Sequence, residues 1–138
     1  MVETLTLTLL TPERKLVDRR PALDLLLPGS EGQIQILRDH APLIGTLETG
    51  LFEVHLQDGS SLSGVISSGF IQIANNDVLV MADTLELKEE IDVSRARQAQ
   101  EKAENTLKEA ELTEATFKKY QLKLQRALVR QNVAAGQI

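Results

Sequence analysis

Four basic side chains recur at helical spacing near the C-terminal end of the sequence. Lys119, Lys123, Arg126 and Arg130 lie four, three and four residues apart, which places them within roughly 60° of one another on a helix of about 100° per residue. Such a basic stripe is either the solvated face of a surface helix or a contact for an acidic protein surface or a phosphate group. Nucleic acid is a less suitable partner because the whole chain is acidic, with a net charge of −5.

Residues that commonly carry catalysis or bind metals are scarce. The sequence has no cysteine and only two histidines, His40 and His55, which do not form an H-x-x-x-H pair. The segment 64–69 has Val65 where a serine-hydrolase G-x-S-x-G elbow needs glycine. Neither a Walker A sequence nor G-x-G-x-x-G occurs. We therefore expect no enzyme, no metal site and no required cofactor.

The elements that would position the basic stripe fall into two halves. From the N-terminus to residue 87 the apolar residues recur with period two, most clearly where Leu5, Leu7 and Leu9 alternate with threonines. Turn residues separate these runs at Pro28-Gly29, Asp58-Gly59, Ser68-Gly69 and 75–77. The other expected strands are 22–27, 33–37, 51–56, 61–66, 70–74 and 78–81. This pattern predicts an antiparallel β sandwich of about ten short strands at 1–87.

The second half, 88–138, changes to helical period. Asp92 is a suitable N-cap for a helix whose apolar stripe is Val93, Ala96, Ala99 or Gln100, Ala103, Leu107 and Ala110. Thr113 can cap a second helix to about Asn132, with an apolar face of Phe117, Tyr120, Leu124, Ala127 and Leu128. The expected fold is a sandwich followed by an antiparallel helical hairpin, α+β by segregation.

Charge separates the same two halves. Residues 1–87 contain five Lys or Arg against twelve Asp or Glu, whereas 88–138 contain ten against eight. A difference of this kind indicates parts with different partners. The start of the sequence lacks a basic region with a long apolar run, and serines and glycines interrupt the least charged stretch, so we expect neither a secretion signal nor membrane insertion.

Three segments carry a resemblance to a known family. Residues 27–43, LPGSEGQIQILRDHAPL, resemble the ATP synthase ε subunit signature G-x-x-G-E-x-G-(I/V)-L-P-x-H-A-P-L. Residues 68–73 are similar to that family's S-G-G-F-x-E-V strand, and 76–84 to its N-x-V-x-V-L-A-D-T segment. The chain departs from the signature at Gln33, Gln35 and Arg38-Asp39, where Glu, Gly and Pro-Gly are usual.

The resemblance implies a non-catalytic central-stalk (rotor) subunit of an F-type ATP synthase. Its sandwich would contact the γ subunit and the c-ring, at the cytoplasmic face of the bacterial inner membrane as a peripheral protein. By analogy, Gly29, Ser30, Glu31, Gly32 and Gln33 face the c-ring, and His40, Ala41 and Pro42 lie near the γ–c contact. Turn geometry alone explains Gly29, Gly32 and Pro42 equally well, and His40 is equally suited to a hydrogen-bonded turn.

The resemblance also implies that the hairpin regulates the complex. In the family it can extend between the catalytic β subunits and inhibit ATP hydrolysis, and their acidic loop would then receive the basic stripe. ATP is a candidate regulatory ligand, since 91–96 match the (I/L)-D-x-x-R-A motif with which some ε subunits bind it. The residues concerned are Glu86, Ile91, Asp92, Arg95, Ala96, Arg126 and Arg130.

Two alternatives remain at this stage. Asp92 is also a helix cap, and Arg95 is suited to pairing with a nearby acid, so the motif has a purely structural interpretation. The competing function is a free-standing nucleotide-sensing module, in which the hairpin closes over the ligand.

Overall fold

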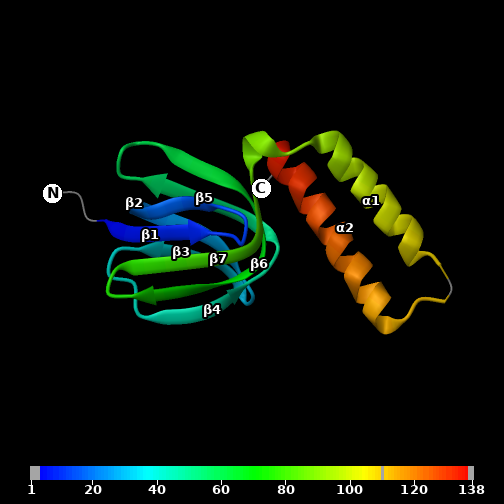
Figure 1. Ribbon diagram of the computed structural model, residues 1–138, viewed down its shortest axis with the longest axis horizontal. Coiled ribbons are helices and arrows are strands. Elements are labelled where there is room, and N and C mark those ends of the chain that lie inside the picture. The colour runs from blue at the N-terminus through cyan, green and yellow to red at the C-terminus, as the bar shows by residue number, and fades with distance from the viewer. Residues whose placement is uncertain (1–3, 110, 137–138) are drawn as a thin grey trace.

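The computed structural model describes residues 4–109 and 111–136. Within that part of the chain, seven strands precede a short 3-10 turn and two helices (Figure 1). The strands are β1 (Leu5–Leu10), β2 (Lys15–Gly29), β3 (Gly32–Leu37), β4 (Leu43–Leu47), β5 (Gly50–Leu56), β6 (Ser61–Ala74) and β7 (Asp77–Leu87). The turn is η1 (Lys88–Glu90), and the helices are α1 (Val93–Leu107) and α2 (Glu114–Ala134). The predicted fold class, a sandwich followed by a helical hairpin, is confirmed.

The strand pairings close into a ring. β1 pairs with β2, β2 with β5, β5 with β6 and β6 with β7, all antiparallel. β7 then returns to β1 in parallel register, an arrangement that the expectation of an antiparallel sandwich did not include. β3 extends the sheet beside β2, and β4 extends it beside β6. The end of β4 also pairs with β2, at Leu47 and Gly29, while β3 pairs with β2 alone among the described strands.

The expected number of strands, about ten, was wrong, since the described residues form seven. The two runs expected at 61–66 and 70–74 are one strand, because Ser68-Gly69 bends β6 without ending it. Both residues have positive φ angles, 57° and 151°, while β7 remains paired on either side of the bend. On its other edge β6 changes partner there, from β5 to β4. A Cβ on Gly69 would lie 2.2 Å from the Met81 carbonyl oxygen, so glycine permits this close approach.

The turns were predicted with mixed success. The Asp58-Gly59 turn between β5 and β6 is confirmed, with a φ of 91° at Gly59. Asn75 and Asn76 form the two-residue turn between β6 and β7, both with positive φ, as tight hairpins require. Pro28-Gly29 is not a turn: these residues end β2, and Ser30-Glu31 make the turn because Gly29 pairs with Gly32. β4, the first seven residues of β2 and the second half of β7 were not predicted.

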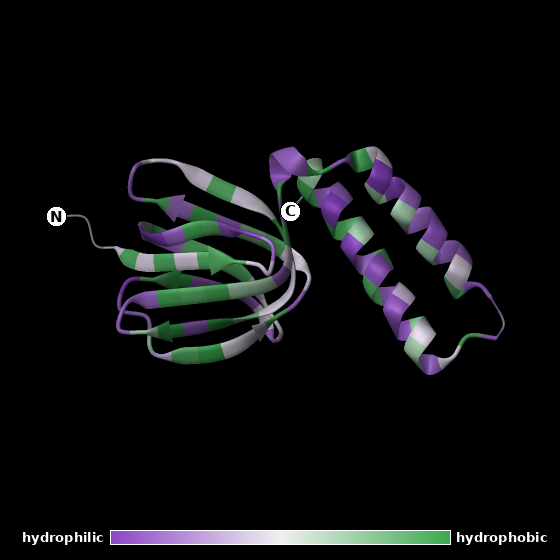
Figure 2. Cartoon of the chain, in the orientation of Figure 1, coloured by the Kyte–Doolittle hydropathy of each residue, from purple (hydrophilic) through white to green (hydrophobic). Residues whose placement is uncertain are grey.

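The core lies inside the ring of strands. Leu5, Leu7 and Leu9 are at most 1% exposed, which confirms the predicted alternation of β1. Their neighbours include Phe52 and Ile71, also fully buried. The same alternation of apolar and polar residues is visible along the sandwich strands in Figure 2. Aliphatic side chains supply most of this core, as expected from a sequence with 3% aromatic residues.

Both helices begin where the sequence predicted. The Asp92 side chain accepts a hydrogen bond from the Arg95 backbone N–H at 3.1 Å, and the Thr113 hydroxyl does the same for Thr116. Ala96, Ala103 and Ala127 are buried where α1 meets α2. Ala110, expected on the α1 stripe, lies outside the described residues.

The apolar face predicted for the second helix is only partly buried. Phe117 and Leu128 are 41% and 40% exposed, while Val133 is buried instead. The reason is that α2 contacts two partners. It meets α1 along one side, and its C-terminal half rests on β5 and β6 (Figure 1). None of the described helices is both long and apolar enough to cross a bilayer.

Candidate functional site

The hairpin meets the sandwich through a small apolar cluster. Leu51, Val65 and Val133 are its buried members, and Ile91 and Val129 pack against them together with Leu26. Four of the six come from the sandwich and the segment that follows it, and two come from α2. The cluster is separate from the sandwich core, so the contact between the two parts is small compared with the sandwich interior.

Two arginines of the basic stripe flank this cluster. Arg130 makes a bidentate ion pair with Glu86, with Nε–Oε1 at 2.7 Å and Nη2–Oε2 at 3.2 Å. Arg126 donates from Nε to the Ser67 hydroxyl at 3.1 Å, and Ser67, which is buried, also hydrogen-bonds Thr49 at 2.9 Å. The structure therefore brings together Glu86, Arg126 and Arg130, which are far apart in the sequence.

The position of Glu86 depends on a glycine in the neighbouring strand β6, whose backbone lies close to the Glu86 carbonyl. Val65 pairs with Glu86 across β6 and β7, and Gly64 pairs with Leu87. A Cβ on Gly64 would lie 2.0 Å from the Glu86 carbonyl oxygen. A larger residue would push the end of β7 away from β6 and move the Glu86 carboxylate relative to α2.

Two cavities adjoin these arginines. One, of about 450 Å³, lies between sandwich and hairpin and is lined by Arg14, Val65, Ser67, Thr84, Leu85, Glu86, Glu90, Arg126 and Arg130. The other, of about 310 Å³, lies between the helices and is lined by Ala99, Lys102, Ala103, Tyr120, Lys123, Arg126, Ala127 and Arg130. Arg126 and Arg130 face both. Guanidinium groups so placed can donate to phosphate oxygens entering from either side.

The 91–96 motif has mainly structural contacts in this conformation. Ile91 packs in the apolar cluster, Asp92 caps α1, and Ala96 is buried against α2. Arg95 is exposed on the first turn of α1. These four motif residues are not among those that line the two cavities. The motif therefore lies beside the Glu86–Arg126–Arg130 group rather than in it.

The remaining half of the basic stripe lies near the other end of α2. The Lys123 ammonium is 4.9 Å from the centre of the Tyr120 ring and that of Lys119 is 6.0 Å away, distances that allow a cation–π interaction for Lys123 at least. The stripe is therefore divided, with two arginines engaged by the sandwich and two lysines exposed to solvent.

A second group of candidate residues occupies the tip formed by β2, β3 and β4. Ser30, Glu31, Gly32 and Gln33 are exposed at the β2–β3 turn. Ser30 donates its backbone N–H to the Thr46 carbonyl at 3.0 Å, and the two hydroxyls are also hydrogen-bonded. Gly29 is required by packing, since a Cβ there would lie 2.7 Å from the Gly32 carbonyl oxygen. A groove of about 530 Å³ runs from this turn along β4.

His40 is a hydrogen-bonded turn residue. Its Nδ1 lies 2.7 Å from the Ala41 carbonyl oxygen, and its backbone N–H donates to Leu37 at 3.1 Å. The neighbouring Asp39 is tied to Asn76 in the β6–β7 turn. Ala41 and Pro42 are exposed, so this loop presents its surface beside β4.

Two features were missed by the sequence analysis. One is an outer face on β1, β4, β6 and β7 that carries several apolar side chains, with Gln72 between Ile44 and Leu79. Phe70, Met81 and Leu10 form one cross-strand row, next to Leu79 and to Ile44, which is 79% exposed. The pattern of apolar residues along these strands could have revealed this face only if the strand pairing had been known.

The other missed feature is an ion pair between Arg14 and Glu90, with Nη2–Oε1 at 2.7 Å and Nη1–Oε2 at 3.0 Å. The hydrogen bond from Arg14 is the main cause of a lowered pKa of Glu90, and the hydrogen bond from the Leu87 backbone N–H lowers this pKa further. No sequence pattern links residues 76 positions apart.

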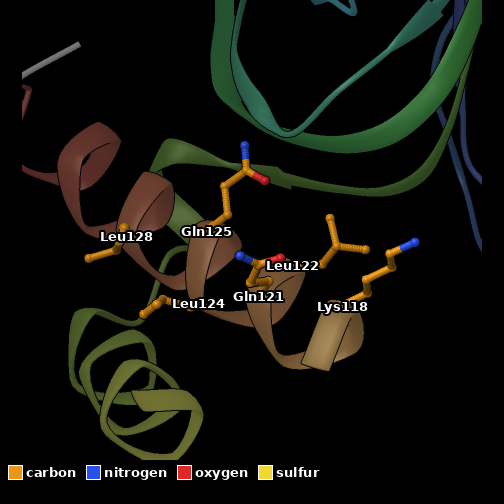
Figure 3. Close-up of a pocket in the computed structure, with 6 residues that line it drawn as sticks. All are labelled: Lys118, Gln121, Leu122, Leu124, Gln125 and Leu128. Carbon is orange, nitrogen blue, oxygen red and sulfur yellow. The ribbon is translucent and has the colours of Figure 1, made fainter. Parts of the chain in front are cut away.

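A groove of about 590 Å³ lies apart from these charged groups. It lies on α2 alone, lined by Lys118, Gln121, Leu122, Leu124, Gln125 and Leu128 (Figure 3). It is a partly apolar stretch of helix surface without a cluster of charged groups. Among the described residues, no group of three His, Cys, Asp or Glu side chains is arranged to hold a metal ion.

Comparison with known families gives two adjoining matches. Residues 4–88 match the family model "ATP synthase, Delta/Epsilon chain, beta-sandwich domain". Residues 89–135 match "ATP synthase, Delta/Epsilon chain, long alpha-helix domain".

Curated relatives agree with these matches. The ATP synthase epsilon chain of Symbiobacterium thermophilum is 34% identical over 132 residues, which cover 96% of this chain and 94% of the relative. That of Desulfitobacterium hafniense strain Y51 is 36% identical over 134 residues, 97% of this chain and 98% of the relative.

Solved structures share the fold. A chain of the Euglena gracilis mitochondrial ATP synthase (OSCP, F1 and c-ring) superposes with a TM-score of 0.83 over 96% of this chain and 81% of that chain, at 23% identity. A chain from the central stalk and c-ring of the Tetrahymena thermophila mitochondrial enzyme gives 0.64 at 14% identity, over 93% and 94% of the two chains.

Proposed function

Because the chain belongs to the ATP synthase delta/epsilon chain family, we propose that it is a non-catalytic epsilon subunit in the central stalk of an ATP synthase. It couples the catalytic head to the c-ring, as a peripheral component at the cytoplasmic face of a bacterial membrane. The observation that carries this proposal is the pair of family matches, which follow each other along residues 4–88 and 89–135. The sandwich and the hairpin of the structure occupy the same order along the chain.

The sandwich supplies the rotor contacts in this proposal. The outer face of β1, β4, β6 and β7, with Ile44 and Phe70 exposed, is suited to a lasting contact with the γ subunit. The exposed β2–β3 turn at Gly29–Gln33 faces the c-ring, and His40–Pro42 lie at the junction of the two contacts. Glu31 is the one charged side chain of that turn, so it is the residue best suited to a polar contact with the ring.

The hairpin supplies the regulation. We propose that it leaves the sandwich and enters the space between catalytic β subunits, where Lys119, Lys123, Arg126 and Arg130 meet an acidic loop. In the docked form Arg126 and Arg130 are engaged by Ser67 and Glu86. Docking and inhibition therefore compete for the same guanidinium groups. Phe117, Leu122 and Leu128 are exposed while the hairpin is docked and add apolar area to the inhibitory contact.

A reconstituted complex tests this role. We expect replacement of all four stripe residues by alanine to raise ATP hydrolysis several-fold, because single exposed ion pairs are worth about 0–1 kcal/mol and the brake depends on their sum. Lys118→Ala is the matched control, since Lys118 lies on the same helix but pairs with Glu114. Unchanged hydrolysis in the fourfold variant, with normal assembly, would contradict a brake on this surface.

ATP is the proposed regulatory ligand of the docked hairpin. Arg126 and Arg130 bind its phosphates next to Glu86, and the neighbouring motif residues Ile91, Asp92, Arg95 and Ala96 complete the site from the start of α1. Titration calorimetry of the isolated full-length chain with ATP measures this directly. We expect Arg126→Ala, Arg130→Ala and Arg95→Ala each to weaken binding at least ten-fold, since hydrogen bonds between charged groups are worth about 1.5–3 kcal/mol. Arg97→Ala, on the exposed side of α1, should bind normally. No heat at millimolar ATP would remove the site.

The second candidate, a free-standing nucleotide-sensing module, is favoured by the same convergence of Glu86, Arg126 and Arg130. Purification of the tagged chain from gently solubilised membranes separates the two. A chain recovered with other ATP synthase subunits supports the stalk role, and one recovered only as a monomer supports the sensor.

A further inference from the structure

The segment that joins sandwich and hairpin is fixed at its middle. We call Lys88–Asp92 the hinge, since it lies between the end of β7 and the start of α1. One carboxylate, that of Glu90, accepts a hydrogen bond from the Leu87 backbone N–H at 2.9 Å and two from Arg14 at 2.7 and 3.0 Å. The Glu90 carboxylate therefore stabilises the 3-10 turn and also fixes the position of this turn relative to β1 and β2.

Arg14 is itself anchored in the sandwich. Its backbone N–H donates to the Thr11 hydroxyl at 3.2 Å, and the Thr11 backbone N–H donates to the Arg14 carbonyl at 2.8 Å. Thr11 is buried. The Arg14 side chain also donates to the Leu85 carbonyl on β7 at 3.3 Å. The guanidinium group thus reaches Glu90 from a turn that has little freedom to move.

We propose that the Arg14–Glu90 ion pair is a clasp that favours the docked position of the hairpin by restricting its hinge. With Glu90 tied to the sandwich, the chain can be redirected before α1 only at Ile91 and Asp92, which must then give up the apolar cluster and the α1 cap. With the clasp open, all five hinge residues can change their backbone angles. The contacts of Arg126 and Arg130 hold α2 itself, so the clasp acts at a different place.

The clasp rests on the proposed function in one respect, namely that the hairpin leaves the sandwich. Its expected size is modest because both side chains are about 40% exposed. An exposed ion pair shifts an equilibrium by about five-fold at most, and the bidentate geometry places this pair toward the upper end. A shift of that size matters where docked and released forms are close in free energy.

Thiol labelling of the full-length chain measures hairpin opening directly. The natural sequence has no cysteine, so one introduced thiol gives an unambiguous signal. Val133→Cys places it in the buried contact between α2 and the sandwich, and Val80→Cys places it in the sandwich core. In the otherwise unchanged chain we expect residue 133 to react faster than residue 80, because the hairpin opens without unfolding of the sandwich.

The clasp is then removed in each probe background. We expect Arg14→Ala and Glu90→Gln each to speed labelling at residue 133 by about three- to five-fold, and the double variant to add little to either. Labelling at residue 80 should stay unchanged. The exchanged pair, Arg14→Glu with Glu90→Arg, should restore part of the protection. Arg20→Ala is the matched control, because its ion pair with Asp58, also at 2.7 Å, lies within the sandwich.

The outcomes separate the two proposals. Equal labelling of residues 133 and 80 in the unchanged chain would mean that the hairpin does not open by itself, and the regulatory motion would fail. Two results would overturn the clasp but not the motion. In one, residue 133 labels faster than residue 80, but substitution of Arg14 or Glu90 does not change its rate. In the other, the effects of the two substitutions add.

Discussion

Asp39 illustrates how one side chain can support a backbone conformation that usually needs glycine. Its φ angle is 65°, in the left-handed region where Asp is tolerated better than most residues. Its backbone N–H donates to the Asn76 side chain at 2.6 Å, and the Asn76 amide donates back to its carboxylate at 3.1 Å. In the family that the chain resembles, glycine is usual at this position. At Gln35, by contrast, the backbone is part of β3, so the loss of that glycine carries no such cost.

His55 carries a pH-dependent contribution to stability. Its Nδ1 lies 2.6 Å from Asp24 across β2 and β5, and this hydrogen bond raises the pKa of His55. Because the folded pKa lies above the unfolded one, the contribution is fully present below the unfolded pKa and disappears as the pH rises through the folded pKa. The pair is half-exposed, so we expect about 0.5–1 kcal/mol.

Urea unfolding on either side of the His55 titration measures this contribution. We expect the unchanged chain to lose more stability than His55→Gln between about pH 5.5 and pH 8. His40→Gln, which removes the other histidine, should lose as much stability over this pH range as the unchanged chain. Identical pH profiles for the unchanged chain and His55→Gln would contradict the assignment.

At the scale of elements, the hairpin depends on small side chains at its seam. Ala96, Ala103 and Ala127 are at most 1% exposed, and their size lets the α1 and α2 backbones approach closely. α1 has no buried residue larger than alanine among those described. The seam therefore holds the helices together by close fit over a small apolar area.

Enlarging one seam residue tests this packing. We expect Ala103→Leu to destabilise the hairpin by about 1–3 kcal/mol, because three added carbon atoms have no space between the helices. Gln98→Leu on the exposed side of α1 is the control and should be nearly neutral. Thermal unfolding followed by helical circular dichroism gives both values. A variant at 103 as stable as the unchanged chain would show that the seam is loosely packed.

Local pattern predicted those elements whose structure is determined locally. The alternation of Leu5, Leu7 and Leu9 and the caps at Asp92 and Thr113 each depend on a few neighbouring residues, and all were correct. β4 was missed because Ile44 is apolar but points outward next to Leu43, so the apolar residues of this strand do not alternate. The bend at Ser68-Gly69 looks like a turn in sequence, and only pairing with β7 shows that the strand continues.

At the scale of the whole molecule, the docked hairpin places the basic half of the chain against the acidic half. Residues 88–138 carry an excess of Lys and Arg, and 1–87 an excess of Asp and Glu. Arg126 and Arg130 mediate this contact at Ser67 and Glu86. The convergence of Glu86 with the arginines was expected from the family resemblance and not from the residues themselves. The Arg14–Glu90 pair was not expected at all, because neither helical nor strand periodicity connects a sandwich turn with the hinge.

The parallel pairing of β1 with β7 has a consequence for how the chain folds during synthesis. Leu5–Leu10 are made first, yet one of their two neighbours, Asp77–Leu87, is the final strand to be translated. The nascent sandwich therefore cannot complete its sheet until Asp77–Leu87 have emerged. Until then, one edge of the first strand stays open to incorrect partners. The helices are translated after all seven described strands.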